Sequence, residues 1–391
     1  MQDSIFFPNY HDGSIVNLMS SIIIGRGGQP PLYAPLKTAQ HLDSFDDAKN
    51  LVLLIIDGLG YDYLVRQGAG SAMQQHLHGS IHAVAPPTTA ASISTFLTGL
   101  APQQHGLMGW YTWFRELGSV VTVLPFLSRC NRSDLTLSGI TPGALYGHRP
   151  VFDLMQDVCY SITPEWLGRS AFNRAHLGKA KLLLYERLEG LFDQISATIR
   201  CDDKRKYIYA YWPGFDALAH EHGVGSAAVS DHFARLDEAF NQLVSNLAGT
   251  ETMLLLCADH GFVDVPDANQ LSVNDMPELQ QCLQLPLCGE PRLAYCYVRD
   301  GMQRQFVDFV RDELAHAVDV VASRDLIRQG LFGLGEPHGE LSARVGDFAL
   351  VMKDNYVLTQ QLLGESIPQM RGFHGGLSQV EVEVPLVTVT C

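Results

Sequence analysis

The stretch Leu51–Gly60, LVLLIIDGLG, most constrains what this chain can fold into. Its first six residues are apolar and offer no polar face, a pattern typical of a central strand that is buried on both sides in a parallel sheet. Asp57 follows at once, at the position where open α/β sheets bind their ligands, and Gly58 and Gly60 allow a sharp turn there. The alternative is that Asp57 only caps the helix that follows.

A second apolar run of this kind, Tyr207–Trp212, is followed by an acid and two histidines. Asp216 and His220 are four residues apart, and side chains at this spacing on one helical turn point the same way and can bind one metal ion together. His222 is the alternative to His220 as the ligand. The sequence therefore predicts part of a metal site directly after this strand.

A third run, Met253–Cys257, is followed by Asp259 and His260, side by side, and then by a glycine. Charged groups buried at a strand end are costly unless they are paired, so this pattern favours metal ligation over simple packing. Much later in the chain, His374 lies between Phe373 and two glycines. Little of the neighbouring sequence could pack around it, which favours a functional histidine over a core histidine.

Two prolines, Pro86 and Pro87, precede the segment Thr88–Gly99 and fix its start, and its final glycine is typical of a helix end. The sequence predicts a short helix here with Thr88 and Thr89 at its N-terminus. Free N–H groups and the positive end of the helix dipole favour an anion such as phosphate at that point, and they favour ionisation of a hydroxyl. The alternative is that the threonines only cap the helix.

Three aromatic residues within four positions, Trp110, Tyr111 and Trp113, lead away from this helix. They suit a pocket wall that stacks on a planar leaving group, and they suit core packing equally well. The sequence leaves both interpretations open.

At 391 residues the chain exceeds the usual single core of about 250–300 residues, which predicts a large domain with an insertion, or two domains. The buried runs predict an α/β fold with a mostly parallel central sheet flanked by helices. We expect the core over residues 1–262 and 346–391, with a smaller inserted α/β lobe over 263–345. Residues 1–50 are expected to be irregular, and 181–199 to form one amphipathic helix.

Charge and composition narrow the range of partners. The chain has 27 Lys and Arg against 42 Asp and Glu, a formal net charge of −15, which argues against nucleic acid as a partner. The first residues lack a signal-peptide pattern, and no run of about 20 apolar residues occurs, so no membrane span is expected and the predicted location is cytoplasmic. The eight scattered cysteines are expected to be reduced thiols. No oligomeric state is predicted.

The order and spacing of these motifs resemble the alkaline phosphatase superfamily and, within it, the type I phosphodiesterase/nucleotide pyrophosphatase family. The resemblance is carried by IIDGLG, PPTTAASISTFLTGLAPQQHG, WPGFDALAHEHG, ADHGF and FHGGLS, and it spans about residues 51–391. It implies an alkaline-phosphatase-like core. It also implies two sets of metal ligands: Asp57, Thr89, Asp259 and His260 for one ion, and Asp216, His220 and His374 for the other.

The resemblance further implies that Thr89 is the nucleophile and that the protein hydrolyses phosphodiester or pyrophosphate bonds through a phospho-threonine. Two divalent ions about 4 Å apart are expected, Zn²⁺ first because of the mixed Asp and His ligands, with Mn²⁺ as the alternative. The expected partner is a small phosphorylated substrate, a nucleotide or another phosphodiester, contacted by Ser92, Trp110 and Tyr111. Ser92 stands where many members of the family have an asparagine.

Several alternatives remain on the same two-metal site: a phosphomutase, a phosphomonoesterase or a phosphonate hydrolase. A non-catalytic protein that binds metal and phosphate is the alternative of another class. A monoester would bring an extra negative charge that needs a further cation, and the first arginine after Thr89 is Arg115. The sequence therefore predicts a preference for diesters over monoesters.

Overall fold

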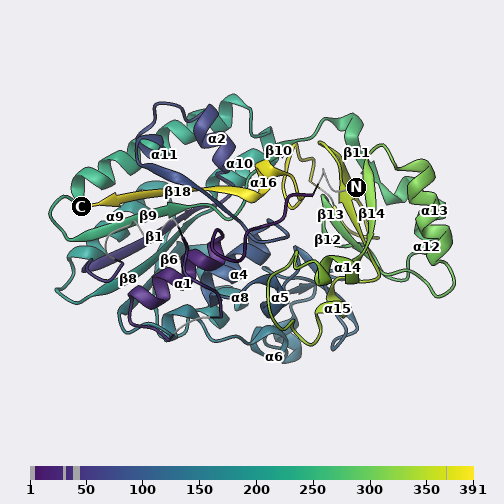
Figure 1. Cartoon of the computed structure of the whole chain (residues 1–391), viewed down its shortest axis with the longest axis horizontal. Coiled ribbons are helices and arrows are strands. Elements are labelled where there is room, and N and C mark those ends of the chain that lie inside the picture. The colour runs from purple at the N-terminus through teal and green to yellow at the C-terminus, as the bar shows by residue number, and fades with distance from the viewer. Residues whose placement is uncertain (1–4, 30–31, 38–44, 367) are drawn as a thin grey trace.

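The computed structural model describes residues 5–29, 32–37, 45–366 and 368–391. Two seven-stranded sheets form two lobes that lie side by side (Figure 1). In spatial order, the strands of the first sheet are β2 (Leu77–His82), β18 (Glu383–Thr390), β9 (Thr252–Cys257), β1 (Asn50–Ile56), β8 (Lys206–Trp212), β6 (Val158–Pro164) and β7 (Lys181–Tyr185).

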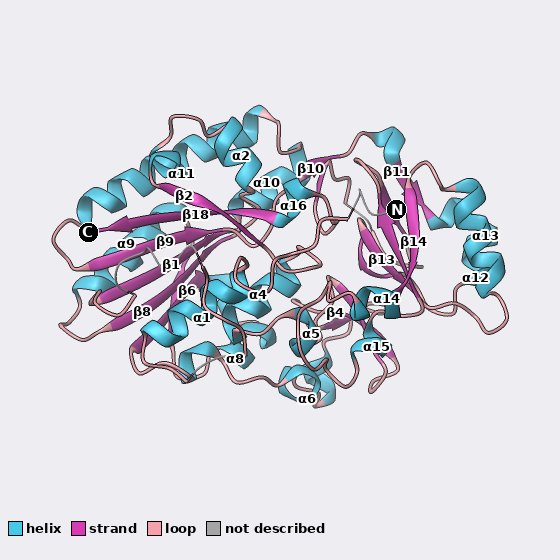
Figure 2. Ribbon diagram, viewed as in Figure 1, coloured by secondary structure: helices cyan, strands magenta, loops and turns pink. Residues whose placement is uncertain are grey.

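The first sheet is mostly parallel, as the sequence predicts. Strand β1 pairs in parallel with β8 on one side and with β9 on the other, and all seven of its residues are buried. Only β18 runs the other way, because it is antiparallel to both of its neighbours, β9 and β2. Figure 2 shows helices on both faces of this sheet, with α2 and α11 on one side and α1 and α4 on the other. The predicted fold class is confirmed.

The helices of the first lobe are short, and only α1, α9 and α11 among those described exceed ten residues. They are α1 (Ile15–Gly25), α2 (Tyr61–Arg66), α3 (Ala72–Gln75), α4 (Thr89–Thr98), α5 (Pro102–His105), α6 (Pro142–Tyr146), α7 (Glu165–Gly168), α8 (Ala171–His176), α9 (Leu188–Arg200), α10 (Gly214–His222), α11 (Ala227–Asn246) and α16 (Gln379–Val382).

The second sheet is antiparallel and takes its strands from two separate stretches of the chain. In spatial order they are β14 (Val318–Ala322), β15 (Phe348–Met352), β13 (Leu293–Cys296), β12 (Cys288–Glu290), β3 (Tyr111–Phe114), β4 (Ser119–Thr122) and β5 (Leu127–Ser128). The helices of this lobe are α12 (Pro277–Cys282), α13 (Gln303–Glu313), α14 (Ser323–Arg328) and α15 (Leu341–Arg344). The predicted lobe at 263–345 stays a proposal; the second sheet also includes β3 to β5 and β15 from outside that range.

Two short strand pairs lie outside the main sheets. Strand β10 (Val263–Asp264) pairs with β17 (Gly372–Phe373), and β11 (Gln270–Ser272) pairs with β16 (Val357–Thr359). The first pair matters for the site, because β10 follows His260 closely and β17 immediately precedes His374. This pairing brings together His260 and His374, which are far apart in the sequence.

Two secondary-structure predictions are wrong. Residues 1–50 are not all irregular, because α1 occupies Ile15–Gly25 and buries its apolar residues. The expected helix at 181–199 is two elements: Lys181–Tyr185 is strand β7, which pairs in parallel with β6, and α9 begins only at Leu188. Successive apolar residues suit a strand as well as a helix, and here pairing with β6 decides in favour of the strand.

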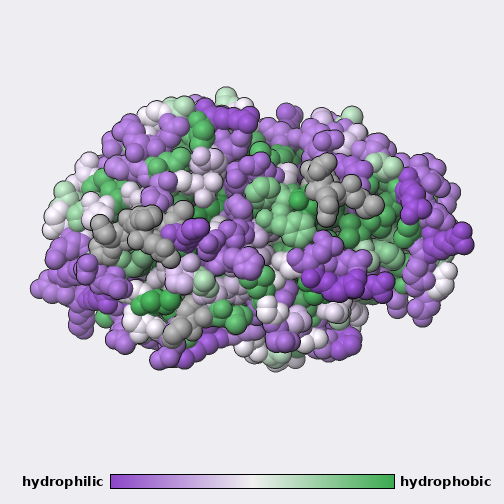
Figure 3. Space-filling model, viewed as in Figure 1, coloured by the Kyte–Doolittle hydropathy of each residue, from purple (hydrophilic) through white to green (hydrophobic). Residues whose placement is uncertain are grey.

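Hydrophilic residues cover most of the face drawn in Figure 3, and hydrophobic residues appear there in small groups. Among the residues described, no helix is both long and apolar enough to cross a membrane. All eight cysteines are free thiols. The cytoplasmic location stays a prediction from the sequence.

Candidate metal centre and adjoining cavity

Three neighbouring strands of the first sheet end at the same edge. Because β8, β1 and β9 are adjacent and parallel, the residues that follow them emerge side by side. Asp57 follows β1, Asp216 and His220 lie on α10 after β8, and Asp259 and His260 follow β9 after one alanine. The geometry of the sheet thus gathers the side chains that the three apolar runs point to.

The first cluster consists of Asp57, Asp259 and His260, all buried, with one ligand atom of each within 4.8 Å of the others. The Nε2 atom of His260 lies 3.2 Å from Asp57 Oδ1 and 3.6 Å from Asp259 Oδ2. The hydroxyl Oγ1 of Thr89 lies 3.3 Å from the same His260 Nε2. The four residues that the family resemblance assigns to one metal ion therefore meet at one point.

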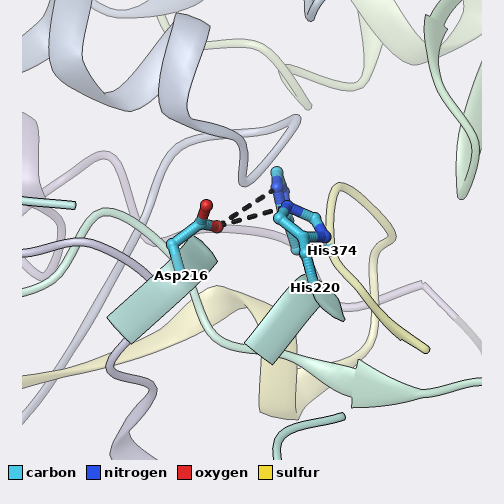
Figure 4. A group of neighbouring side chains, drawn as sticks. All are labelled: Asp216, His220 and His374. Atoms are coloured by element: carbon cyan, nitrogen blue, oxygen red, sulfur yellow. Dashed lines mark ion pairs between the residues drawn. The ribbon is translucent and has the colours of Figure 1, made fainter. Parts of the chain in front are cut away.

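The second cluster consists of Asp216, His220 and His374, again with ligand atoms within 4.8 Å of one another. In Figure 4 the Asp216 carboxylate points toward both imidazoles, and its Oδ1 atom lies 3.3 Å from His220 Nε2 and 3.8 Å from His374 Nε2. His220 Nδ1 lies 2.9 Å from the Gly372 carbonyl oxygen, a contact that orients the ring and leaves Nε2 facing the cluster. The two clusters adjoin, since His260 Nε2 is 3.9 Å from Asp216 Oδ1.

The shifted pKa values of the buried acids show that a cation bound in the clusters would stabilise their charged forms. Burial raises the pKa of Asp57 well above its usual value, and the nearby charge of Asp216 adds to this. Burial likewise raises the pKa of Asp259, with Asp57 adding to it. Burial also lowers the pKa of His374 well below its usual value, with His260 and His220 contributing, so this ring is held neutral as a metal ligand must be.

Three buried carboxylate oxygens in the clusters accept no hydrogen bond from any residue that the structure describes: Asp57 Oδ1, Asp216 Oδ1 and Asp259 Oδ2. Asp57 Oδ2 does accept one, from the hydroxyl of Tyr211. Buried polar atoms in proteins almost always have a partner. Because the three oxygens face the imidazoles of the same clusters, these residues fit two divalent cations.

Thr89 is the first residue of α4, and Thr88 is the N-cap. The Thr88 hydroxyl donates a hydrogen bond to Glu290 Oε1 at 2.5 Å and so points away from the clusters toward the second sheet. Thr89 instead places its hydroxyl beside His260, where the N–H groups at the start of a ten-residue helix also point. Of the two threonines, it is therefore Thr89 whose hydroxyl adjoins the candidate metal clusters.

A cavity of about 470 Å³ opens from the second cluster. Its core wall comes from the first lobe and includes Thr88, Thr89, Asp216, His220, Phe373 and His374. Its lobe wall comes from the second sheet and its turns and includes Trp110, Tyr111, Arg129, Arg132, Leu287, Cys288, Gly289, Glu290, Pro291 and Ala294. The cavity therefore lies between the two sheets, and Trp110 and Tyr111 lie on its wall, whereas their contact with a substrate stays a prediction.

Other predicted site residues lie elsewhere. Ser92 is fully buried and donates its hydroxyl to the Asp259 carbonyl oxygen at 2.7 Å, and it is not among the described residues that line the cavity. Its role as a substrate contact stays a prediction that this hydrogen bond does not support. His222 faces Glu221 at the surface, 3.6 Å away, so His220 and not His222 joins the cluster. Trp113 packs edge-on against Tyr297.

Sequence reasoning missed Glu290, a buried acid in the cavity wall. Its Oε1 atom accepts hydrogen bonds from the Thr88 hydroxyl and from the Trp110 backbone N–H, the latter at 2.6 Å. Burial raises the pKa of Glu290 to about 7, although these two hydrogen bonds act against the rise. Gly375 has a φ of +96°, and a Cβ there would lie 2.7 Å from Glu290 Cβ, so the glycine after His374 makes room for this side chain.

A buried ion pair between the lobes was also missed. Arg292 binds Glu381 through two hydrogen bonds, 2.7 and 2.9 Å long. The Glu381 carboxylate also accepts from the Gly376 N–H at 2.8 Å, and its backbone carbonyl accepts from the Gly261 N–H at 2.8 Å. Gly261 follows His260, and Gly376 lies two residues after His374. One acid therefore fixes both histidine loops to each other and to the second lobe.

The arginines near the cavity differ from what the sequence suggests. Arg115, the first arginine after Thr89, pairs with Glu340 at the surface. Arg129 and Arg132 lie on the cavity wall instead. Nothing in the sequence around them signals this position, because it depends on the second sheet folding back over the first.

Comparison with known proteins supports the family resemblance that the sequence motifs indicate. A family model described as "Type I phosphodiesterase / nucleotide pyrophosphatase" matches residues 51–377. A comparison with curated protein sequences finds no match.

Solved structures with the same fold include murine ectonucleotide pyrophosphatase/phosphodiesterase 5, an inactive form in complex with AMP, at a TM-score of 0.64 and 16% identity over 86% of this chain and 87% of that chain. The human protein of the same name matches at 0.63 and 15% identity, over 86% and 87%. Phosphonoacetate hydrolase from Sinorhizobium meliloti 1021, in complex with phosphonoformate, matches at 0.64 and 15% identity, over 88% and 90%.

At 15–16% identity the structural likeness establishes the fold alone. The family match spans most of the chain and establishes the family. The predicted family is confirmed: the chain belongs to the type I phosphodiesterase/nucleotide pyrophosphatase family, within the alkaline phosphatase superfamily.

Proposed function

We propose that this protein is a two-metal hydrolase of phosphodiester or pyrophosphate bonds, with Thr89 as its nucleophile. The observation that carries the proposal is the position of the Thr89 hydroxyl, 3.3 Å from His260 Nε2 at the start of α4. Both candidate metal clusters adjoin this point. A hydroxyl that served only to cap a helix would not need that neighbourhood.

In the proposed site, Asp57, Asp259, His260 and Thr89 hold one divalent ion, and Asp216, His220 and His374 hold the other. Mixed carboxylate and imidazole ligands suit Zn²⁺ first, with Mn²⁺ as the alternative. When bound, such ions favour the ionised hydroxyl and offset the charge that develops on the phosphoryl group.

The residues of the chain perform the remaining steps. Thr89 gives up its hydroxyl proton to solvent and attacks phosphorus in line, while the N–H groups at the start of α4 bind the phosphoryl oxygens. As the phospho-threonine forms, the bond from phosphorus to the opposite oxygen breaks, and the leaving group departs with that oxygen and takes up a proton from solvent. A water molecule then attacks from the opposite side and releases Thr89. Two inversions at phosphorus give net retention of configuration.

The proposed substrate is a small phosphodiester or pyrophosphate whose substituent lies in the cavity against Trp110 and Tyr111. Arg129 is fully engaged by Glu365 and by two backbone carbonyls, so it is not free to meet the extra charge of a monoester. AMP in one structural neighbour and phosphonoformate in another are consistent with a small phosphorylated ligand. The second of these keeps a phosphonate hydrolase as the alternative activity.

The test is a substrate panel combined with metal analysis. Elemental analysis of the purified protein should give close to two divalent ions per chain, and EDTA should abolish turnover. Bis-p-nitrophenyl phosphate and p-nitrophenyl-thymidine phosphate should be cleaved with a higher kcat/KM than p-nitrophenyl phosphate and than a phosphonate. A monoester faster by about tenfold would indicate a phosphatase, and phosphate returned to substrate a mutase. A metal-loaded protein inactive on every substrate would indicate a binding protein.

A further inference from the structure

The cavity has a positively charged residue that the proposed chemistry does not use. Arg132 lies on the lobe wall, in the turn after β5, and is exposed. Within the part of the chain that the structure describes, its side chain makes no hydrogen bond or ion pair. It is therefore available to a ligand.

The turn that carries Arg132 is closed by hydrogen bonds. The Arg132 N–H donates to the Ser128 carbonyl at 2.8 Å, and the Ser128 N–H donates to the Ser133 carbonyl at 2.9 Å. These bonds hold Arg132 at a φ of +54°, a left-handed conformation that is uncommon for residues other than glycine. The strain persists only because the surrounding turn enforces it.

Arg129, at the base of the same turn, has a different role. Its guanidinium donates to Glu365 at 2.9 Å and to the carbonyls of Leu287 and Gln360 at 2.6 and 2.7 Å. The central carbon Cζ of the Arg129 guanidinium also lies 3.8 Å from the centre of the Tyr111 ring. Arg129 therefore fastens the turn to the cavity wall and forms the ion pair with Glu365. Arg132 interacts with Glu365 only at longer range, so its guanidinium N–H groups stay free to bind a ligand.

We propose that Arg132 forms an anion subsite, so that the preferred substrates carry a second anionic group, a carboxylate or a phosphate, on the substituent remote from the scissile bond. This inference rests on the proposed function for the position of the scissile phosphoryl group. With that group at Thr89 on the core wall, the substituent crosses the cavity toward the lobe wall. An arginine there can bind either anion through two parallel hydrogen bonds.

Glu365 also lines the cavity and interacts electrostatically with Arg132, but its carboxylate is paired with Arg129. The other acid on the lobe wall is Glu290, which does not cancel the charge of Arg132. Its carboxylate is buried and already accepts two hydrogen bonds, from Thr88 and Trp110. Because burial raises its pKa to about 7, a large share of it is neutral near neutral pH. The lobe wall therefore attracts anions through Arg132.

The experiment uses three p-nitrophenyl phosphodiesters that differ in one group: propyl, 2-carboxyethyl and 2-phosphonoethyl. Arg132→Gly removes the charge and accepts the left-handed backbone. It should lower kcat/KM for one or both anionic esters by about 10–100-fold, the loss expected for one charge-assisted contact, and change the propyl ester less than about twofold. Arg304→Gln, on exposed α13, is the matched control for loss of one positive charge and should change none of the three.

A binding measurement separates this proposal from the proposed function. Calorimetry on the zinc-loaded protein compares 3-phosphonopropionate with propylphosphonate, and needs no turnover. The wild type should bind the carboxylate-bearing ligand about tenfold or more tightly, and Arg132→Gly should remove that preference. Equal binding of the two ligands, or a preference that survives in Arg132→Gly, overturns the anion subsite even if diesters are hydrolysed. A preference seen without any hydrolysis overturns the proposed function alone.

Discussion

The two sheets of this protein contribute to the site in different ways. In the mostly parallel first sheet, three adjacent strands deliver their C-terminal ends to one edge, and the candidate metal ligands gather there. In the antiparallel second sheet, neighbouring strands run in opposite directions, so their C-terminal ends do not gather at one edge, and single residues of the strands and turns line the cavity. The difference suggests that the first sheet performs the chemistry and the second selects the substrate.

The division of roles between the two sheets is incomplete at the hairpin of β12 and β13. Glu290 at the end of β12 binds Thr88, next to the proposed nucleophile, and Arg292 binds Glu381, which holds both histidine loops. The second lobe therefore also contacts the groups that position the chemistry. The following variants test how far the two roles can be separated.

Loss of the proposed nucleophile should give the largest effect, and its cause should lie in the first sheet alone. Thr89→Ala should lower kcat by at least ~10³-fold, because the attacking oxygen is removed, while the fold is kept since little core volume is lost. Steady-state kinetics on bis-p-nitrophenyl phosphate, with circular dichroism as the check on folding, measures this. Thr88→Ala is the matched control and should retain most activity. A dead Thr88→Ala with an active Thr89→Ala would reverse the assignment.

Breaking the ion pair between the lobes should affect stability and metal binding together. Arg292→Met leaves Glu381 buried and unpaired, which should reduce the free energy of unfolding by about 3–5 kcal/mol. Because Glu381 fixes the loops of His260 and His374, zinc affinity should fall by about 10–100-fold. Urea unfolding and a zinc competition titration measure the two effects.

Arg304→Met, on exposed α13, is the control for the ion-pair variant and should stay within about 0.5 kcal/mol of the wild type. If Arg292→Met unfolds at the same urea concentration as the wild type and binds zinc equally well, the lobes are independent, and the contrast between the sheets is sharper than the structure suggests.

Glu290 should make stability depend on pH. Burial raises the pKa of its carboxyl in the folded state to about 7, above the usual 4.5, so the folded state binds the proton more tightly. Its contribution to stability is therefore full below pH 4.5 and is lost as the pH rises toward 7. Glu290→Gln, which mimics the neutral acid, should match the wild type near pH 5 and exceed it at pH 8 by on the order of 3 kcal/mol.

Urea unfolding between pH 5 and 8 in the presence of a chelator measures this difference without a contribution from metal release. The exposed Glu313→Gln should follow the wild type at every pH. A gap between Glu290→Gln and the wild type that does not change with pH would contradict the assigned cause.

The smallest effect should come from the aromatic wall of the second lobe. Trp110→Ala should raise KM for p-nitrophenyl-thymidine phosphate by roughly 3–10-fold through lost stacking, and leave kcat within about twofold. Initial-rate kinetics separates the two constants. Trp166→Ala, at an exposed position on α7, should change neither. A fall in kcat with an unchanged KM for Trp110→Ala would instead connect this wall to the chemistry.

The sequence predicts the first sheet well for a physical reason. Asp57, Asp259 and His260 directly follow buried strands, so the strand and its functional group form one local pattern. His374 is different: its own surroundings suggest a functional residue, but only the family resemblance assigns it to a metal. Its place in the fold depends on the short pairing of β10 with β17, two strands more than a hundred residues apart.

Apart from Trp110 and Tyr111, the lobe wall could not be predicted in this way. Glu290 and Thr88 are 202 residues apart in sequence, and Arg292 and Glu381 are 89 apart, so no local pattern connects them. An acid in a polar loop is usually exposed, and only the folding of the second sheet over the first buries Glu290. The sequence therefore favours two metal clusters and a nucleophile, and leaves the groups that choose the substrate undetermined.

Strand β18 lies between β9 and β2, although it follows both of them in the chain. During synthesis at roughly 5–20 residues per second, about 125 residues separate the end of β9 at Cys257 from the start of β18 at Glu383, an interval on the order of 6–25 s. Throughout it, the apolar strand β9 has one open edge, which another nascent chain could pair with. Ribosomes that pause between β9 and β18 should therefore increase aggregation, whereas ribosomes that pause before β9 is made should not.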